Sequence, residues 1–266
     1  MGAWDNYDVM HNTFGNNLRD MWVGHTRENV ARMFMDSPSC RTVKINGIAQ
    51  DVVIVRKNKT EMDQKIIMSI PGEHLEHGGI VDFANNKWLI TMLDADNQIY
   101  DRGIMQQCNH ILRWIGKDGQ LKQKWCFVAD GTKYLIGERS EEIMTVGDAR
   151  IAVTVGKDED TVELARGLRF LIDDTDSEAC LAYQITKPNK MFNVYNGKGV
   201  FRFIMTEVNL EDGDNKVLRI ANYADWHPPV KTDGDHVDSN LSIAHITHVA
   251  KDAADMPPAD EKEGWL

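Results

Sequence analysis

The chain lacks several features that mark common classes of protein. Its four cysteines are widely spaced and form no CxxC pair, so free thiols and synthesis in a reducing cytoplasm are expected. No apolar run is long enough to cross a bilayer, and no charged-then-apolar signal segment follows Met1. We therefore expect a protein with no membrane partner.

Nucleotide-binding and hydrolase motifs are also missing. The sequence has no GxGxxG before a helix, no GxxxxGK[ST] and no GxSxG. A basic surplus is absent as well. The formal net charge is -11, and a surface with that excess does not attract DNA phosphates, so sequence-specific DNA binding is not expected. No pair of carboxylates stands out for acid–base work. We therefore expect no enzyme and no cofactor, with a β-rich metal-dependent hydrolase as the weaker alternative.

What is present is a regular series of short strands. The stretch Gly78 to Gly137 holds four or five strand-like runs separated by turn signals such as Asn85-Asn86, Asp118-Gly119 and Asp130-Gly131. Side chains alternate with a period of two from Ile104 to Trp114, which indicates half-buried antiparallel strands. Trp88, Trp114 and Trp125 lie in this stretch, which is therefore the expected main core.

One helix is expected, from Asn16 to Asp36. An asparagine can cap its start, and Ser37-Pro38 ends it. Its apolar residues recur at three- and four-residue steps and are expected to pack against the chain's own sheet. They are Leu18, Met21, Trp22, His25, Val30, Met33 and Phe34. Hairpins are expected at Asn46-Gly47 and Asn196-Gly197.

The expected fold is mainly β, with two small antiparallel barrel- or sandwich-like lobes, one N-terminal helix and extended termini. The charged run Glu138 to Gly147 breaks the strand alternation and is taken as the junction. The expected segments are an arm at 1–15, the helix and first β lobe at 16–140, a second β lobe at 141–223 and a tail at 224–266.

Metal sites are weakly suggested at several places. Cys108, His110 and Cys126 could approach one another on neighbouring strands, but no fourth ligand is evident, so buried thiols are the simpler interpretation. His245, His248 and Asp252 form a second, equally incomplete set. The acidic loops Gly156 to Asp160, Ile172 to Glu178 and Leu210 to Asn215 fit no EF-hand loop, so strand connections are expected there.

The order of motifs from Gly78 to Asn209 resembles a known group of proteins. The runs GGIVDFANNKWLIT, YDRGIMQQCNHILRW, KWCFVADGTKYLIGE, MTVGDARIAVTV, RGLRFLIDD and YQITKPNKMFNVYNGKGVFRFIMTEVN carry the similarity. They resemble head-closure or head–tail connector (neck) proteins of tailed bacteriophages. The similarity covers about half of the chain and concerns turns and aromatic residues rather than a catalytic motif.

The resemblance implies a structural virion protein that joins head to tail beneath the portal. It implies a homo-oligomeric ring, sixfold or twelvefold, with a portal or adaptor protein above, a tail protein below, and double-stranded DNA passing through a closed or lined channel. An acidic lumen would let that DNA slide. The location would be the virion neck, after synthesis in the bacterial cytoplasm. Other virion components, such as a tail terminator, baseplate or minor capsid protein, are the alternatives.

Two sets of residues are candidate contacts in such an assembly. Aromatic and apolar residues near the two ends are candidate anchors for a neighbouring chain, because large apolar side chains make good interface contacts. They are Trp4, Tyr7, Trp226, Trp265 and Leu266. The polar loop after the second strand is a candidate to project into the channel. It contains Lys57, Asn58, Lys59, Thr60 and Glu61.

Overall fold

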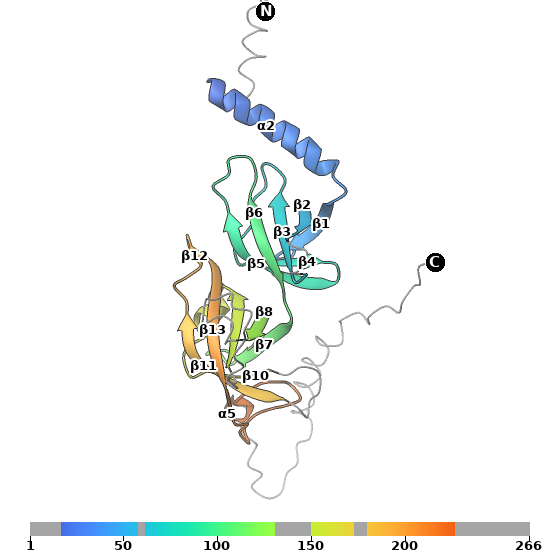
Figure 1. Cartoon of the computed structure of the whole chain (residues 1–266). Helices are drawn as coiled ribbons and strands as arrows, with labels where there is room; N and C mark the ends of the chain where they lie inside the picture. The colour runs from blue at the N-terminus through green and yellow to red at the C-terminus, as the bar shows by residue number, and fades with distance from the viewer. Residues whose placement is uncertain (1–16, 58–61, 131–149, 173–179, 227–266) are drawn as a thin grey trace, which may run out of the picture. The chain divides into compact units, whose positions relative to one another are not determined.

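The computed structural model describes residues 17–57, 62–130, 150–172 and 180–226, and it confirms the mainly β fold (Figure 1). Six strands form the first barrel: β1 (Cys40–Ile45), β2 (Ile48–Arg56), β3 (Gln64–Ser69), β4 (Ile80–Phe83), β5 (Asn86–Asp94) and β6 (Arg102–Gln107). They pair antiparallel in the order β1-β2-β3-β6-β5-β4, and β4 pairs back with β1. The barrel is therefore closed.

Sequence signals account for the local structure of this barrel. Asn46 and Gly47 both have positive φ, at 50° and 84°, which is the backbone that a two-residue hairpin needs. The next expected turn is shifted by one residue, because Ala84 and Asn85 take the positive φ values. The interior is filled by fully buried apolar side chains, among them Val52, Ile67 and Met105, with Trp88 packed beside them.

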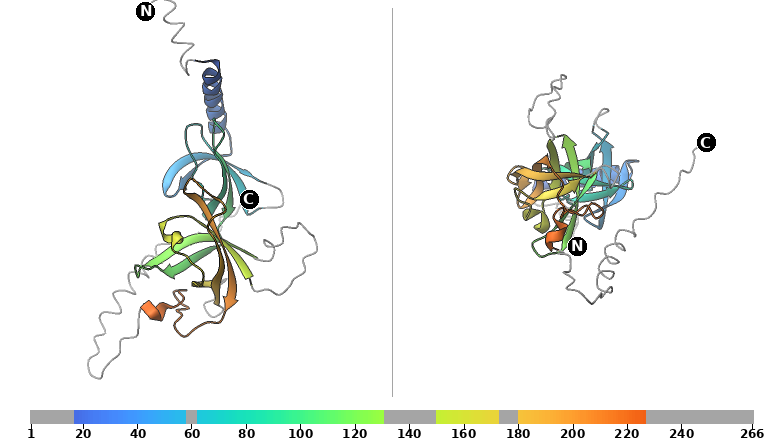
Figure 2. Two further views of the ribbon diagram at one scale, coloured as in Figure 1. Left: turned by 90° about the vertical axis from the view of Figure 1, so that its left-hand side faces the viewer. Right: turned by 90° about the horizontal axis from the view of Figure 1, so that it is seen from below.

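The second barrel follows in the chain. Its sheet runs in the order β10-β11-β13-β9-β8-β7, with the short strand β12 paired to β13. The bounds are β7 (His110–Ile115), β8 (Leu121–Asp130), β9 (Arg150–Gly156), β10 (Arg169–Ile172), β11 (Leu181–Asn189), β12 (Val194–Tyr195) and β13 (Lys198–Val208). The end strands meet where the ring of Trp114 packs edge-on against Phe170, so this barrel is nearly closed (Figure 2).

The division between the lobes differs from the expected one near residue 140. Strand β7 pairs with β8, and β8 pairs with β9, so the second barrel begins at His110 and only Cys108 and Asn109 separate it from β6. The expected single core is likewise two cores, because Trp88 belongs to the first barrel and Trp114 to the second. The alternation of side chains runs on through this short link, which is why no loop signal marks it.

Helix α2 (Leu18–Met35) precedes the first barrel, as expected, with Asn17 as its N-cap. Its packing differs from the expected stripe. Only the C-terminal half contacts the barrel, where Phe34 is buried and meets Tyr100 with ring centroids 5.1 Å apart. Leu18, Trp22 and Met33 are at least 60% exposed. They lie on the opposite side of the helix from Phe34 and therefore cannot share its contact.

Two further short helices belong to the second barrel. Helix α4 (Glu159–Val162) follows the acidic loop after β9, where Asp158 and Thr161 form a capping box that starts a helical turn. Helix α5 (Tyr223–Trp226) ends the described part of the chain.

Candidate interaction surfaces

Three glycines join the two barrels through their backbones. Gly78, just before β4, packs against Gly156 at the end of β9 and Gly199 in β13. A Cβ on Gly78 would lie closer than 3.0 Å to the carbonyl oxygen of Gly199, and a Cβ on Gly156 equally close to that of Gly78. We call this contact the glycine seam. It leaves no room for any side chain.

An apolar cluster lies beside the glycine seam. Leu89 and Ile80 of the first barrel pack with Val200 and Trp125 of the second, and with Cys108 of the link. Two further contacts cross between the barrels: the Lys198 ammonium pairs with the Glu76 carboxylate, and the rings of His77 and Tyr195 stack 6.0 Å apart. The barrels are therefore held by backbone, apolar and polar contacts together.

A groove of about 550 Å³ opens next to these contacts, lined in part by Glu76, Lys124, Asp158 and Lys198. Its charges are largely paired. The Nζ atom of Lys124 lies 2.6 Å from Asp158 and 2.8 Å from Asp160, and the Nζ atom of Lys122 lies 2.8 Å from Asp160. Hydrogen bonds from Lys122 and Lys124 hold the pKa of Asp160 below its usual range.

These ion pairs bear on whether the carboxylates of the acidic loop Gly156 to Asp160 are available to bind a metal ion. The carboxylates of Asp158 and Asp160 are used by two lysines and by the cap of α4. Asp214, in the loop Leu210 to Asn215, is paired with Arg169 in the same way. No group of three or more metal-ligating side chains occurs among the described residues. Of the loop Ile172 to Glu178, only Ile172 lies within the described residues.

The thiol candidates are buried among apolar neighbours. Burial raises the pKa of Cys108 to about 12 and that of Cys126 further. The Sγ atom of Cys126 lies 3.5 Å from the carbonyl oxygen of His110, its neighbour across the strand pair. Thiols held protonated in this way are poor metal ligands and poor nucleophiles.

The rate of thiol labelling should distinguish Cys40 from the other three cysteines. Cys40 is partly exposed, whereas Cys108, Cys126 and Cys180 are buried. We expect Ellman's reagent at pH 8 to modify Cys40 first and the buried three more slowly, on the order of a hundredfold, since the thiolate is the reacting form. Four thiols should react at once in denaturant. Two or more fast-reacting thiols in the native chain would contradict the buried placement.

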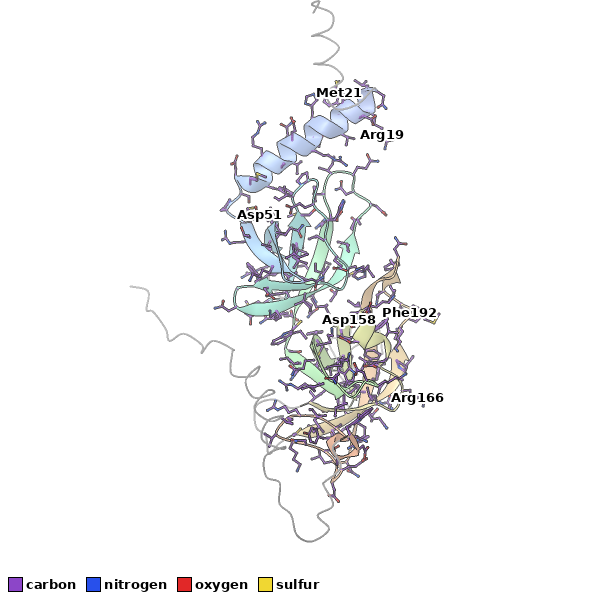
Figure 3. The ribbon with its side chains drawn as sticks, turned by 180° about the vertical axis from the view of Figure 1, so that it is seen from behind. Arg19, Met21, Asp51, Asp158, Arg166 and Phe192 are labelled. Carbon is purple, nitrogen blue, oxygen red and sulfur yellow. The ribbon has the colours of Figure 1, made fainter. Side chains whose placement is uncertain are left out.

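The hairpin between β11 and β13 ends in a group of exposed apolar side chains, among them Phe192, which Figure 3 labels. Met191 is 86% exposed, Phe192 70% and Tyr195 68%. The backbone beneath them is well fixed. The amide of Phe192 donates to Asn189 Oδ1 at 3.2 Å, and the amide of Val200 donates to the carbonyl of Asn193 at 3.1 Å. We call Met191, Phe192 and Tyr195 the hairpin tip.

The run Met191 to Tyr195 reads in the sequence as an ordinary strand, so the hairpin tip was not predicted. Pro188-Asn189 and the asparagines at 193 and 196 are turn signals that could have located it. Asn193 and Asn196 both take positive φ. A run of exposed apolar residues on a turn, rather than on a strand face, is typical of a contact with another molecule.

The residues proposed as anchors and as a channel loop fall mostly outside the described part of the chain. Trp4, Tyr7, Trp265 and Leu266 lie there, as do Asn58, Lys59, Thr60 and Glu61 of the channel loop, and also His245, His248 and Asp252. Trp226 is described, is 46% exposed, and lies beside Gly119 at the turn between β7 and β8. The Nζ atom of Lys57 donates to Gln64 Oε1 at 2.5 Å, at the base of the channel loop.

The acidity of the chain is not carried by the barrels. The described ranges hold 24 of the 30 Lys and Arg residues and 22 of the 41 Asp and Glu residues, a net charge of +2. The other 6 basic and 19 acidic residues lie outside them. The described residues as a whole therefore carry no acidic surplus. None of the helices in the described ranges has the length and apolarity needed to span a membrane.

Comparison with known proteins gives one family. Residues 12–107 match the family model of the YomX N-terminal domain. No curated protein and no solved structure matches the chain. The matched range ends at the last residue of β6, so it takes in helix α2 and the whole first barrel and nothing of the second. Over these residues the chain is similar to the YomX N-terminal domain of a phage-derived family, and this similarity indicates a phage protein.

Proposed function

We propose that the protein is a structural component of the phage virion, in the head–tail connector, where copies of the chain form a ring that joins head to tail. The observation that carries the proposal is the placement of large apolar side chains at the hairpin tip and along α2, exposed on two firmly joined barrels. Exposed apolar groups of this kind favour contacts between proteins over catalysis. The similarity to a phage-derived family supports the virion setting.

The partners follow from this role. The ring would be sixfold or twelvefold, with a portal or adaptor protein on one side, a tail protein on the other, and double-stranded DNA passing without sequence-specific contacts. The protein would act in the virion neck, after synthesis in the host cytoplasm, without a cofactor and without catalytic chemistry. The near-neutral barrels suit this role, because a strongly basic surface would hold the DNA backbone.

Deleting the gene tests the role directly. We expect filled heads that carry no tail, and we expect wild-type particles to show this chain as a ring in a cryo-EM map of the neck. A plasmid copy of the gene should restore tailed particles, which controls for effects on neighbouring genes. Density for the chain at the far end of the tail, in the capsid shell or nowhere in the particle would overturn the connector role.

The two ends of the chain should matter for assembly more than for folding. Residues 1–12, with Trp4 and Tyr7, and those from Pro257 onward, with Trp265 and Leu266, lack a sustained apolar period, so they bring little apolar area to a core. We expect chains shortened by either segment to keep nearly the wild-type melting temperature while entering particles less efficiently.

Melting and incorporation should be measured on the same shortened chains, so that the two effects can be separated. A shortened chain that unfolds or aggregates would place that end in the core. A shortened chain that supports normal tail joining would show that the end is dispensable for assembly.

A further inference from the structure

Helix α2 carries a hollow in addition to its exposed apolar side. The hollow has a volume of about 450 Å³ and is lined by Asp20, Val23, Gly24, Arg27, Glu28 and Gln98. Gly24 stands in the middle of the helix, where glycine costs about 0.5–1 kcal/mol relative to alanine. The sequence therefore accepts a less stable helix at the place where the surface is hollowed.

The charges around this hollow leave it acidic. The guanidinium of Arg27 is directed at the carbonyl oxygen of Gln98, with Nε at 2.8 Å and Nη2 at 2.5 Å. Its donors are thus turned to the loop between β5 and β6. The carboxylates of Asp20 and Glu28 lie at the rim on exposed residues, and that of Asp20 also accepts a hydrogen bond from Asn17 Nδ2 at 2.6 Å. An incoming group with an apolar end and basic flanks would suit such a hollow.

The hairpin tip has those properties. Its apolar side chains are flanked by the exposed Lys187 and by Lys190, whose Nζ atom donates to the carbonyl oxygen of Val162 at 2.5 Å. The hairpin tip is a protrusion of the second barrel. The hollow lies on helix α2, which packs on the first barrel. The hairpin tip is also fixed before binding, which lowers the entropy that association costs.

We propose that the hairpin tip of one copy inserts into the hollow on helix α2 of a second copy, with Phe192 over Val23 and Gly24 and with Lys187 facing Asp20 and Glu28. Such a contact is heterologous, since each copy offers one surface and receives the other, so repetition builds a ring or a filament. The inference rests on the proposed function in so far as it names the subunit contact of the proposed ring.

Two variants test the contact from opposite sides, with analytical ultracentrifugation of the full chain over a range of concentrations as the measurement. Phe192→Asp places a charge on the hairpin tip, and Gly24→Leu fills the hollow while favouring the helix. We expect wild type to associate and each variant to associate at least about tenfold more weakly, as for a central interface residue. Val217→Asp is the matched control, because Val217 is 83% exposed in another loop, and it should associate as wild type does.

Mixing the two variants gives the decisive result. The hairpin tip of the Gly24→Leu chain can enter the intact hollow of the Phe192→Asp chain, so an equimolar mixture should form one-to-one dimers that grow no further. A mixture that stays monomeric would overturn the proposal, as would a monomeric wild type or a Phe192→Asp chain that associates normally. A wild-type chain that is monomeric alone but present in necks would overturn this contact and leave the connector role standing. A chain that associates in solution through this contact but is absent from particles would support the contact and overturn the connector role.

Discussion

Replacing Gly78 with alanine should lower the free energy of unfolding by about 2–5 kcal/mol, the sum of two costs. Gly78 has a φ of 86°, a left-handed backbone that costs an L-residue about 1–2 kcal/mol. The added Cβ would also overlap the carbonyl oxygen of Gly199, and overpacking of this kind typically costs about 1–3 kcal/mol. Urea denaturation of the purified chain measures the change.

Two other glycines separate these costs. Gly156 has no positive φ, so Gly156→Ala tests the overlap alone and should cost about 1–3 kcal/mol. Gly47 has a φ of 84° and nothing within 4 Å of a new Cβ, so Gly47→Ala tests the backbone alone and should cost about 1–2 kcal/mol. If Gly156→Ala proves as stable as wild type, the glycine seam is not a tight contact.

Removing the guanidinium of Arg169 should be the most damaging change in the second barrel, at about 3–5 kcal/mol for Arg169→Leu. Its Nη1 and Nη2 atoms bind the two oxygens of Asp214 at 3.1 and 2.8 Å, and the Asp214 side chain is completely buried. The same carboxylate accepts hydrogen bonds from the amides of Glu211 and Asn222. Loss of the arginine would leave a buried, unpaired carboxylate and release the segment after β13.

Three further variants test whether the stranded buried carboxylate causes this loss. Arg169→Lys should recover little, since an ammonium cannot reproduce the two-pronged contact. Arg169→Leu combined with Asp214→Leu should be less damaging than Arg169→Leu alone, because no charge is then stranded. Glu211→Gln is the matched control: its carboxylate also meets Arg169, at 2.9 Å, but is 62% exposed, so a loss under about 1 kcal/mol is expected. Equal losses for Glu211→Gln and Arg169→Leu would contradict the account.

The fold was largely predictable, because strand alternation and turn residues act locally. Asn46-Gly47 and Asn196-Gly197 occur as hairpin turns with the expected backbone. The division into barrels was not predictable from turns, since the link has none. A finer signal exists in the burial: Met105 faces the first core, whereas Leu112 and Trp114, on the other face of the alternation, point into the second. The alternation itself continues through the link, but the face that is buried changes there.

The interaction surfaces were less predictable, for a physical reason. A period in the sequence shows which side chains share a face, but it cannot show which face finds a partner. Leu18, Trp22 and Phe34 were all expected to pack on the sheet, yet Leu18 and Trp22 lie on the other side of the helix and only Phe34 reaches the barrel. The net charge of the sequence likewise cannot show where on the molecule the charges lie. A net charge of -11 suggested acidic surfaces, and only the placement of residues shows that the barrels themselves are close to neutral.

The link between the barrels has a mechanical consequence. The amide of Cys108 is bound to the carbonyl of Lys87 in the first barrel, and the side chain of Asn109 is bound to the backbone of Val128 in the second. The joint is thus little more than one peptide unit with no slack. Two extended residues span at most about 7 Å. A pulling force on one barrel would therefore be transmitted to the other through the covalent bonds of this link. If the contacts between the barrels broke under that force, the barrels would rotate about the link.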